Sequence, residues 1–141
     1  MLAPFDYFVE SKQSPDERAW VASLRGRKGA TMRYLMFVCT DPSAEQYDPM
    51  QDNIESWVSE MDGRGIRISG SRLTGMDQAI TVRKRNGKVL RTDGPFAETK
   101  EWIGGFDVLE CASLDEAVEV AAKHPMARFG KIEIRPFWLA D

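Results

Sequence analysis

A group of ionisable side chains follows a conformationally restricted turn near the middle of the sequence. The turn reads Asp93-Gly94-Pro95-Phe96, and the polar residues behind it are Glu98, Thr99, Lys100 and Glu101. A carboxylate held near an ammonium group in a partly dry cleft can serve as a general base or hold a polar ligand. This chemistry predicts a site in which Asp93 and Lys100 are catalytic, while Thr99 and Glu101 bind the substrate.

The same turn also has a purely structural interpretation. An aspartate before glycine can accept backbone N–H bonds in an Asx-type turn, and Gly94 supplies an unusual φ. Pro95 would then fix the chain, and Phe96 would pin the loop to the core. Glu98 and Glu101 are more often solvated charges than catalysts. The sequence leaves both interpretations open.

His124 is the single histidine and therefore the one side chain that titrates near neutrality without perturbation. It is expected at the C-terminus of a helix that Pro125 ends, where an imidazolium is favoured by about 0.3–1 kcal/mol. A catalytic role beside Asp93 is the alternative, and it requires the fold to bring the two residues together. Arg135 could anchor an anionic substrate in such a site.

Two helices must help to position these residues. The first is predicted to begin at Asp48-Pro49, an N-cap followed by a proline at the first helical position, and to end at Gly63. The second begins at the capping box Ser113–Glu116, worth about 1 kcal/mol, and ends at Pro125. The apolar stripes predicted to be buried are Ile54, Trp57, Val58 and Met61 in the first helix, and Leu114, Ala117, Val118 and Ala121 in the second.

Six strands are predicted around these helices. Their ranges are 33–39, 66–71, 78–84, 88–92, 103–111 and 131–138. Asn86-Gly87 joins the third and fourth strands and suits a type I′ hairpin, since both residues tolerate positive φ. The order β-α-β-hairpin-β-α-β is that of a ferredoxin-like split βαβ fold with an inserted hairpin, in the α+β class. In that topology Cys39 and Cys111 fall at opposite ends of the sheet, too far apart for a disulfide.

One face of this sheet would lack a covering layer. Two helices cannot cover both faces, yet the strand 33–39 is apolar on both sides, and Phe37, Phe137 and Trp138 add large apolar groups. A second copy of the chain would supply the missing layer. We therefore predict a homodimer in which two sheets face each other.

The first 31 residues differ from the rest. Ser14-Pro15 starts a predicted short helix, and 25–29 is a basic, glycine-containing linker. Residues 1–31 are expected to be an appendage to a compact domain at 32–141. The appendage could dock through Trp20, or Met32 could equally be the true initiator.

Composition restricts the classes of partner. A chain of 141 residues has room for one domain, and a net charge of −3 gives it no general attraction to nucleic acid or anionic lipid. No apolar run reaches the roughly 18 residues that cross a bilayer, and acidic residues near the start argue against a signal peptide, so a cytoplasmic location is expected. Two cysteines and one histidine at these spacings predict no metal site, and no cofactor-binding motif is found. The basic residues of the hairpin are expected to form a solvated edge.

The segment 89–101 resembles the signature of the YCII-related, DGPF-motif family. Further matches are Met32-Arg33-Tyr34, Asn86-Gly87, Gly104-Gly105-Phe106, His124-Pro125 and Glu133-Ile134-Arg135-Pro136. The resemblance covers Met32 to Trp138. It implies a dimeric α+β barrel built from two ferredoxin-like sheets placed face to face.

The same resemblance bears on function. Members of this family are uncharacterised, are often encoded beside extracytoplasmic-function sigma factors, and in the YCII branch are suggested to act through a His-Asp pair. The acidic residue of that pair corresponds here to His124, and no matching histidine lies upstream. Two functions stay open: acid–base chemistry on a small polar molecule near the DGPF loop, or a non-catalytic role beside a sigma-factor system. A converging polar cleft would favour the first, and exposed, scattered loop residues the second.

Overall fold

The computed structural model describes residues 31–96 and 101–139 of the chain. Its strands are β1 (Met32–Cys39), β2 (Arg67–Arg72), β3 (Ile80–Arg85), β4 (Lys88–Asp93), β5 (Ile103–Cys111) and β6 (Lys131–Pro136). Its helices are α3 (Ile54–Gly63), α4 (Leu114–Ala122) and α5 (Met126–Phe129), and two short 3-10 turns lie at Pro49–Gln51 and Met76–Gln78. The predicted appendage, apart from Thr31, lies outside the described residues.

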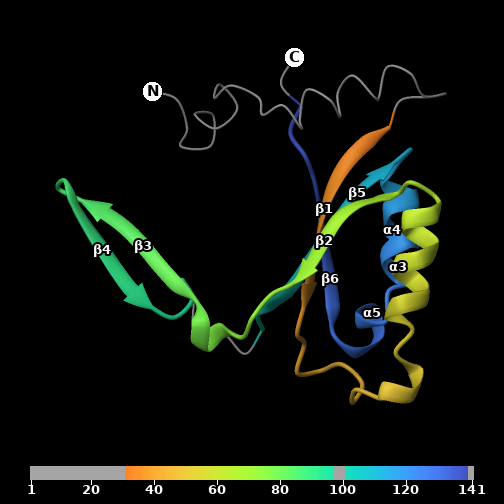
Figure 1. Cartoon of the computed structure of the whole chain (residues 1–141), viewed down its shortest axis with the longest axis horizontal. Helices are drawn as coiled ribbons and strands as arrows, with labels where there is room; N and C mark the ends of the chain where they lie inside the picture. Colours follow the sequence, from red (N-terminus) through yellow and green to blue (C-terminus); the bar gives the residue numbers. More distant parts are fainter. Residues whose placement is uncertain (1–30, 97–100, 140–141) are drawn as a thin grey trace.

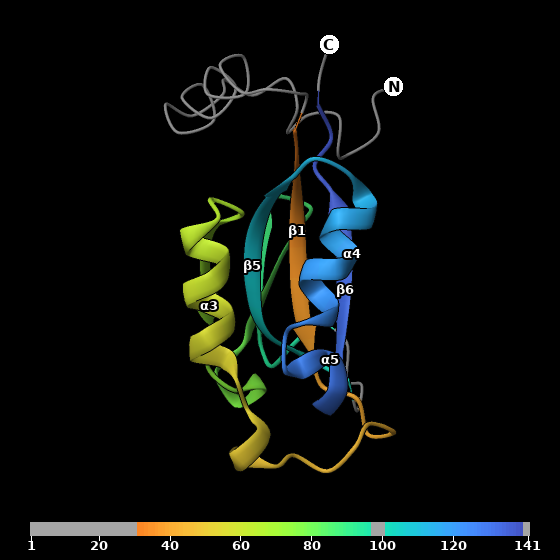
Figure 2. The same ribbon diagram turned by 90° about the vertical axis from the view of Figure 1, so that its right-hand side faces the viewer.

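Four of these strands form one antiparallel sheet in the order β2-β5-β1-β6. Helices α3 and α4 both lie against the same face of this sheet (Figures 1 and 2). β3 and β4 form a separate two-stranded sheet, which is inserted in the sequence between β2 and β5 although those two strands are neighbours in the main sheet. The predicted α+β, ferredoxin-like fold with an inserted hairpin is confirmed.

The core fills the space between the helices and the sheet. Buried residues come from β1, α3, β5 and α4; among them are Tyr34, Met36, Trp57, Met61, Leu109, Cys111, Ala117 and Val120. The indole Nε1 of Trp57 donates a 2.9 Å hydrogen bond to the carbonyl oxygen of Val120, which ties α3 to α4. Each large apolar side chain buried here stabilises the fold by about 1.5–3 kcal/mol. Both cysteines are free thiols, and the register places Cys39 opposite Ile103 but Cys111 opposite Met32, at the two ends of the sheet.

The first helix begins later than its sequence predicts. Asp48 does act as an N-cap, but its carboxylate accepts the N–H of Met50 and caps only the 3-10 turn. Asp52 then adopts an extended conformation with ψ 105°, which interrupts any continuous helix. Its side chain accepts the N–H of Ile54 at 3.0 Å, where α3 begins. Asp48 thus caps only the 3-10 turn, and at the start of α3 Asn53 occupies the N-cap position while Asp52 accepts the first N–H.

The buried stripe of α4 is also rotated from the predicted one. Leu114 and Val118 are exposed, whereas Val120 is buried together with Ala117 and Ala121. Leu114 and Val118 lie instead beside Ile132 and Ile134 of β6, while Ala117, Val120 and Ala121 join the core. The capping box at its start is confirmed: Ser113 Oγ accepts the N–H of Glu116, whose carboxylate accepts the N–H of Ala112.

The hairpin β3–β4 extends away from the sheet on the side opposite the helices (Figure 1). Asn86 has φ 51° and Gly87 has φ 77°, so both turn positions have the positive φ that was predicted for this dipeptide. No helix in the described part of the chain is long and apolar enough to span a bilayer.

Candidate functional site

The DGPF turn lies at the base of the hairpin and is held by backbone hydrogen bonds. Gly94 has φ 109°, a conformation that favours glycine, as predicted. Its N–H donates to the carbonyl oxygen of Ala79 at 2.7 Å, and its own carbonyl oxygen accepts a 2.8 Å bond from the Thr81 hydroxyl. The turn is therefore fixed to the chain that enters β3.

The side chains of this turn are mostly in solvent. Phe96 is 89% exposed, so the expectation that it pins the loop to the core is wrong. Backbone bonds at Gly94 already hold the turn, and the base of the hairpin lies away from the helix-covered core. The Asp93 side chain is 90% exposed and lies 4.0 Å from Arg91 Nε. The proposed site residues Thr99 and Lys100 lie outside the described residues.

His124 is a core residue at the junction of α4 and α5. Its Nδ1 accepts the N–H of Met126 at 3.0 Å, and its ring packs edge-on against Trp57 with centroids 4.7 Å apart. Burial lowers the pKa of His124 to about 4, although the negative charge of Asp52 opposes this shift. The expected imidazolium at a helix end is wrong, because a buried ring that accepts an N–H at Nδ1 is neutral.

Within one chain, the fold does not bring His124 and Asp93 together. The α4–α5 junction lies on the helix side of the sheet, whereas β4 extends from the opposite side (Figure 1). His124 is 5% exposed and Asp93 is almost fully exposed. The acid–base partnership considered for these two residues thus has no geometric basis in a single copy.

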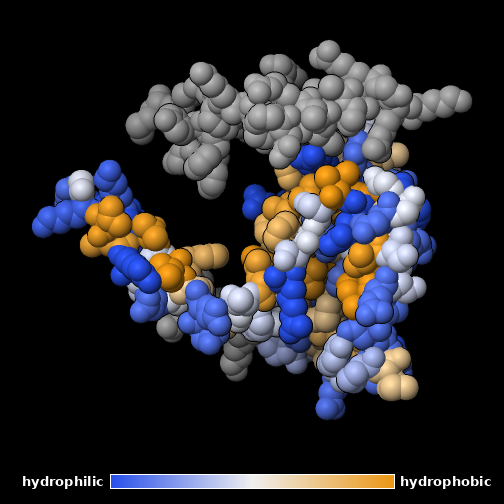
Figure 3. Space-filling model, viewed as in Figure 1, coloured by the Kyte–Doolittle hydropathy of each residue, from blue (hydrophilic) through white to orange (hydrophobic). Residues whose placement is uncertain are grey.

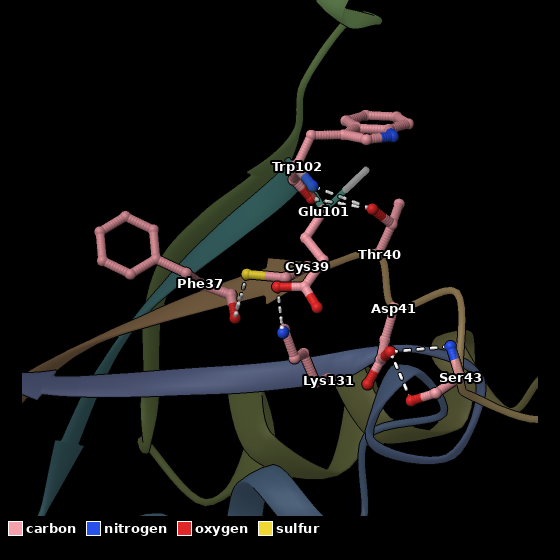
Figure 4. Close-up of polar contacts among 8 residues, drawn as sticks. All are labelled: Phe37, Cys39, Thr40, Asp41, Ser43, Glu101, Trp102 and Lys131. Carbon is pink, nitrogen blue, oxygen red and sulfur yellow. Dashed lines mark hydrogen bonds and ion pairs between the residues drawn. The ribbon is translucent and has the colours of Figure 1, made fainter. Parts of the chain in front are cut away.

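A different group of polar side chains does converge where the DGPF loop joins the sheet (Figure 4). It comprises Cys39, Thr40, Asp41, Glu101, Trp102 and Lys131, which we call the β1-end cluster. The chain segments of Thr40 and Trp102 are cross-linked there: the N–H of Thr40 donates to the Trp102 carbonyl, and the N–H of Trp102 donates to the Thr40 hydroxyl, both at 2.9 Å. These bonds fix the position of Glu101, the residue before Trp102.

An ion pair between Lys131 and Glu101 lies at the centre of this cluster. The hydrogen bond that Lys131 donates to Glu101 raises the pKa of Lys131, and the negative charge of Asp41 acts in the same direction. Asp41 accepts hydrogen bonds from the N–H and hydroxyl of Ser43, which lower its pKa. The cluster therefore presents the ammonium group of Lys131 and the ionised carboxylate of Asp41 at an accessible surface.

The Cys39 thiol beside this ion pair is not activated. Burial raises its pKa, and the charge of Glu133 adds to the effect, whereas Lys131 lowers it. The sulfur lies 3.8 Å from the carbonyl oxygen of Phe37, at the outer limit of a weak hydrogen bond. A thiol with a raised pKa is a poor nucleophile at neutral pH.

The cluster includes one residue of the predicted site, and a second lies on the same strand as Lys131. Glu101 was predicted to bind substrate, and Arg135 to anchor an anion. Arg135 is exposed on β6 opposite Leu35, and alternation along the strand places it on the same face as Lys131. In the two described stretches, no three histidine, cysteine or carboxylate side chains gather closely enough to hold a metal ion.

Sequence reasoning missed Cys39, Thr40 and Lys131 as parts of a site. Each lies at or next to the end of a strand. In the predicted topology these strand ends lie together at one end of the sheet, and this could have indicated a shared site. It also missed a buried ion pair on the helix face, in which Arg67 Nε donates to Asp107 at 2.7 Å. Asp107 gave no signal because it falls within the apolar run of β5.

Comparison with known proteins agrees with this architecture. A family model described as the YCII-related domain matches residues 32–139. Uncharacterized protein R00369 of Rhizobium meliloti (strain 1021) is 44% identical over 71 residues, which cover 49% of this chain and 57% of that protein. The matched region thus spans little more than half the length of that relative. Because the family model covers all six strands, the chain belongs to the YCII-related domain family.

Proposed function

We propose that this protein, as a homodimer, binds a small polar molecule at the β1-end cluster and transfers a proton to or from it. The observation that carries this proposal is the Lys131–Glu101 ion pair at the end of the DGPF loop. In a single copy of the chain the pair is accessible, since the side chains of Lys131 and Glu101 are 44% and 49% exposed.

The charges of the pair favour a ligand that carries both an anionic and a hydrogen-bond-donating group. Lys131 would bind a carboxylate or phosphate oxygen, since its raised pKa keeps the ammonium group charged. Glu101 would accept a hydrogen bond or a proton from the ligand. A small amino acid or hydroxy acid matches this arrangement of charges.

The other residues of the predicted site are assigned roles from their positions in the sequence. Asp93, Thr99 and Lys100 belong to the loop that ends at Glu101, so they are the proposed source of further binding or basic groups. Arg135 is the proposed second anchor for an anion. His124 has no part in it, because its ring is buried and neutral.

The homodimer is proposed from the sheet face that carries no helix. Leu35 lies opposite Val108 and Phe37 opposite Phe106 in the β1–β5 register, so all four share one face. That face is opposite the buried Tyr34 and Met36, because side chains alternate along a strand. We call it the open face. A second copy placed against it would remove four apolar side chains from water.

A thermal-shift screen tests this function. Small amino acids, hydroxy acids and sugar phosphates would be added to wild type, Lys131→Met and Lys123→Met. Lys123 is a matched control, since it forms a similarly exposed ion pair with Glu60 on the helix side. A compound that raises the unfolding temperature of wild type and Lys123→Met, but not of Lys131→Met, supports the proposal. Equal stabilisation of all three proteins contradicts it.

A second candidate is a non-catalytic accessory protein. The observation that favours it is the exposure of Asp93 and Phe96 in the DGPF turn, where a ligand site would bury such groups. The family resemblance makes an extracytoplasmic-function sigma factor the partner to test. Binding of that purified sigma factor to wild type but not to Phe96→Ser, together with an empty screen, would favour this candidate.

A further inference from the structure

The β3–β4 hairpin has one apolar face that no other element of the described chain covers. Ile80 and Val82 alternate along β3, and Val89 lies opposite Lys84 in the hairpin register, which places the three apolar side chains on one face. Val82 and Val89 are 65% and 68% exposed. Figure 3 shows the hairpin standing apart from the body of the molecule, with hydrophobic surface along it.

A two-stranded hairpin of this kind is marginally stable in water by itself. Its strands pair only with each other, so its apolar face gains nothing from the four-stranded sheet. An exposed apolar patch with charged residues around it is typical of a protein interface. Nothing in the described part of the chain supplies the apolar surface that this face needs, so we look for that surface on a second molecule.

Charge indicates which surface this is. The hairpin has five basic residues and one acidic residue, a net charge of +4; they are Arg83, Lys84, Arg85, Lys88, Arg91 and Asp93. The whole chain has a net charge of −3, so the rest of it carries −7. A strongly basic arm on an otherwise acidic protein is complementary to the body of a second copy of the same protein.

We propose that the apolar face of the hairpin docks on a second copy of this chain. This inference rests on the homodimer of the proposed function and identifies the element that holds it together. The hairpin extends from the open-face side of the sheet, which is the side where the second copy would lie (Figure 1). Its three apolar side chains then contact the partner, and Lys84 and Arg91, which share their face, lie against the partner's carboxylates.

The docked arm also affects the candidate site. Asp93 is the last residue of β4, and Glu101 follows it by eight positions. An arm held against the partner fixes one end of that short loop, while the Thr40–Trp102 bonds fix the other. Dimerisation thereby sets the position of Asp93 relative to Glu101 of the β1-end cluster.

Sedimentation equilibrium of the full chain tests this inference. The double variant Val82→Asp/Val89→Asp disrupts the apolar face, and Leu90→Asp is the matched control, since Leu90 lies opposite Arg83 on the other face of the same hairpin. We expect wild type to be dimeric and the double variant to raise the dimer dissociation constant roughly tenfold or more. The dimer dissociation constant of Leu90→Asp should stay close to that of wild type. Equal weakening by the control overturns the assignment of the face.

Cross-linking provides a measurement that does not depend on a variant. A mixture of unlabelled and 15N-labelled protein would be treated with a zero-length carboxyl–amine cross-linker. We expect peptides that join Lys84, which lies on the docking face, to carboxylates of the other isotopic form.

The results separate the two proposals. A wild type that is monomeric throughout overturns both the arm and the homodimer. If Phe37→Asp on the open face abolishes a dimer that the hairpin variants leave intact, and no mixed-isotope hairpin links form, the arm is overturned and the homodimer stands.

Discussion

Arg67 Nε donates a 2.7 Å hydrogen bond to Asp107 Oδ1, which joins β2 to β5 on the helix side of the sheet. The same guanidinium reaches Asp62 of α3 at 3.2 Å, so one arginine links three elements. Burial raises the pKa of Asp107, and the charge of Arg67 partly offsets this. The carboxylate occupies space that Gly70 leaves empty, since a Cβ at that position would lie 2.0 Å from Asp107 Oδ1.

Gly70→Ala should therefore destabilise the protein by about 2–4 kcal/mol, because the methyl group displaces a buried, paired carboxylate. Gly63→Ala is the control, since a Cβ there meets nothing within 4 Å. It should leave stability unchanged or raise it by up to about 1 kcal/mol. Urea unfolding measures both changes. A loss below about 0.5 kcal/mol for Gly70→Ala would show that the pair can be displaced without cost.

His124 should make stability depend on pH. Its pKa is about 4 in the folded protein against 6.5 when unperturbed, so the unfolded chain binds the proton more readily. The contribution of neutral His124 to the free energy of unfolding is complete above pH 6.5. It is lost as the pH falls from 6.5 to 4, by up to roughly 3 kcal/mol. In His124→Gln, the free energy of unfolding should change less between pH 6.5 and pH 5 than it does in wild type. Titration of the His124 ring by NMR near pH 6.5 would show that the ring is not buried as described.

The DGPF phenylalanine should contribute little to stability. Phe96→Ala should change the free energy of unfolding by less than about 0.5 kcal/mol, as expected for an exposed side chain. Leu109→Ala, which truncates a fully buried side chain of β5, should cost about 2–5 kcal/mol. Denaturant unfolding compares the two variants. A comparable loss for both would mean that Phe96 packs against apolar groups after all.

The reactivity of the Cys39 thiol should depend on the charge of Lys131. Because Lys131 lowers the pKa of this thiol, Lys131→Met should move the pH–rate profile of Cys39 alkylation to higher pH. Lys123→Met should not change the profile. Cys111 should stay unmodified in the folded protein, since it is fully buried and its pKa is raised to about 12. An unchanged profile in Lys131→Met would mean that the ammonium group does not act on Cys39.

Much of the fold could be predicted because local chemistry and global topology agree in this sequence. The Asn86-Gly87 turn, the Ser113 capping box and the apolar runs of β1 and β5 each specify their own conformation. The helix start at Ile54 was missed because the extended conformation of Asp52 ends the turn that Asp48 caps, and neither glycine nor proline marks this break in the sequence. The rotation of α4 was missed because Leu114 and Val118 continue the apolar pattern of the helix, although both are exposed in the structure.

The candidate site was harder to predict because it is assembled from separate strand ends. Glu101 was identified from the DGPF loop, but Lys131, its partner, lies 30 positions later and reaches it only through sheet topology. His124 was assigned a charge because position in a helix is visible in sequence, whereas burial against Trp57 is not. Phe96 was placed in the core because aromatic residues are usually buried, which single-sequence reasoning cannot check in a loop.

NMR mapping of the 15N-labelled chain can locate a ligand at the β1-end cluster. Pools of small amino acids, hydroxy acids and sugar phosphates would be added while the amides of Thr40 and Lys131 and the indole of Trp102 are followed. We expect one pool to shift these three signals together, and we expect the shifts to disappear in Lys131→Met but to persist in Lys123→Met. If no pool moves them, or if the shifts gather elsewhere and persist in Lys131→Met, the β1-end cluster is not a ligand site.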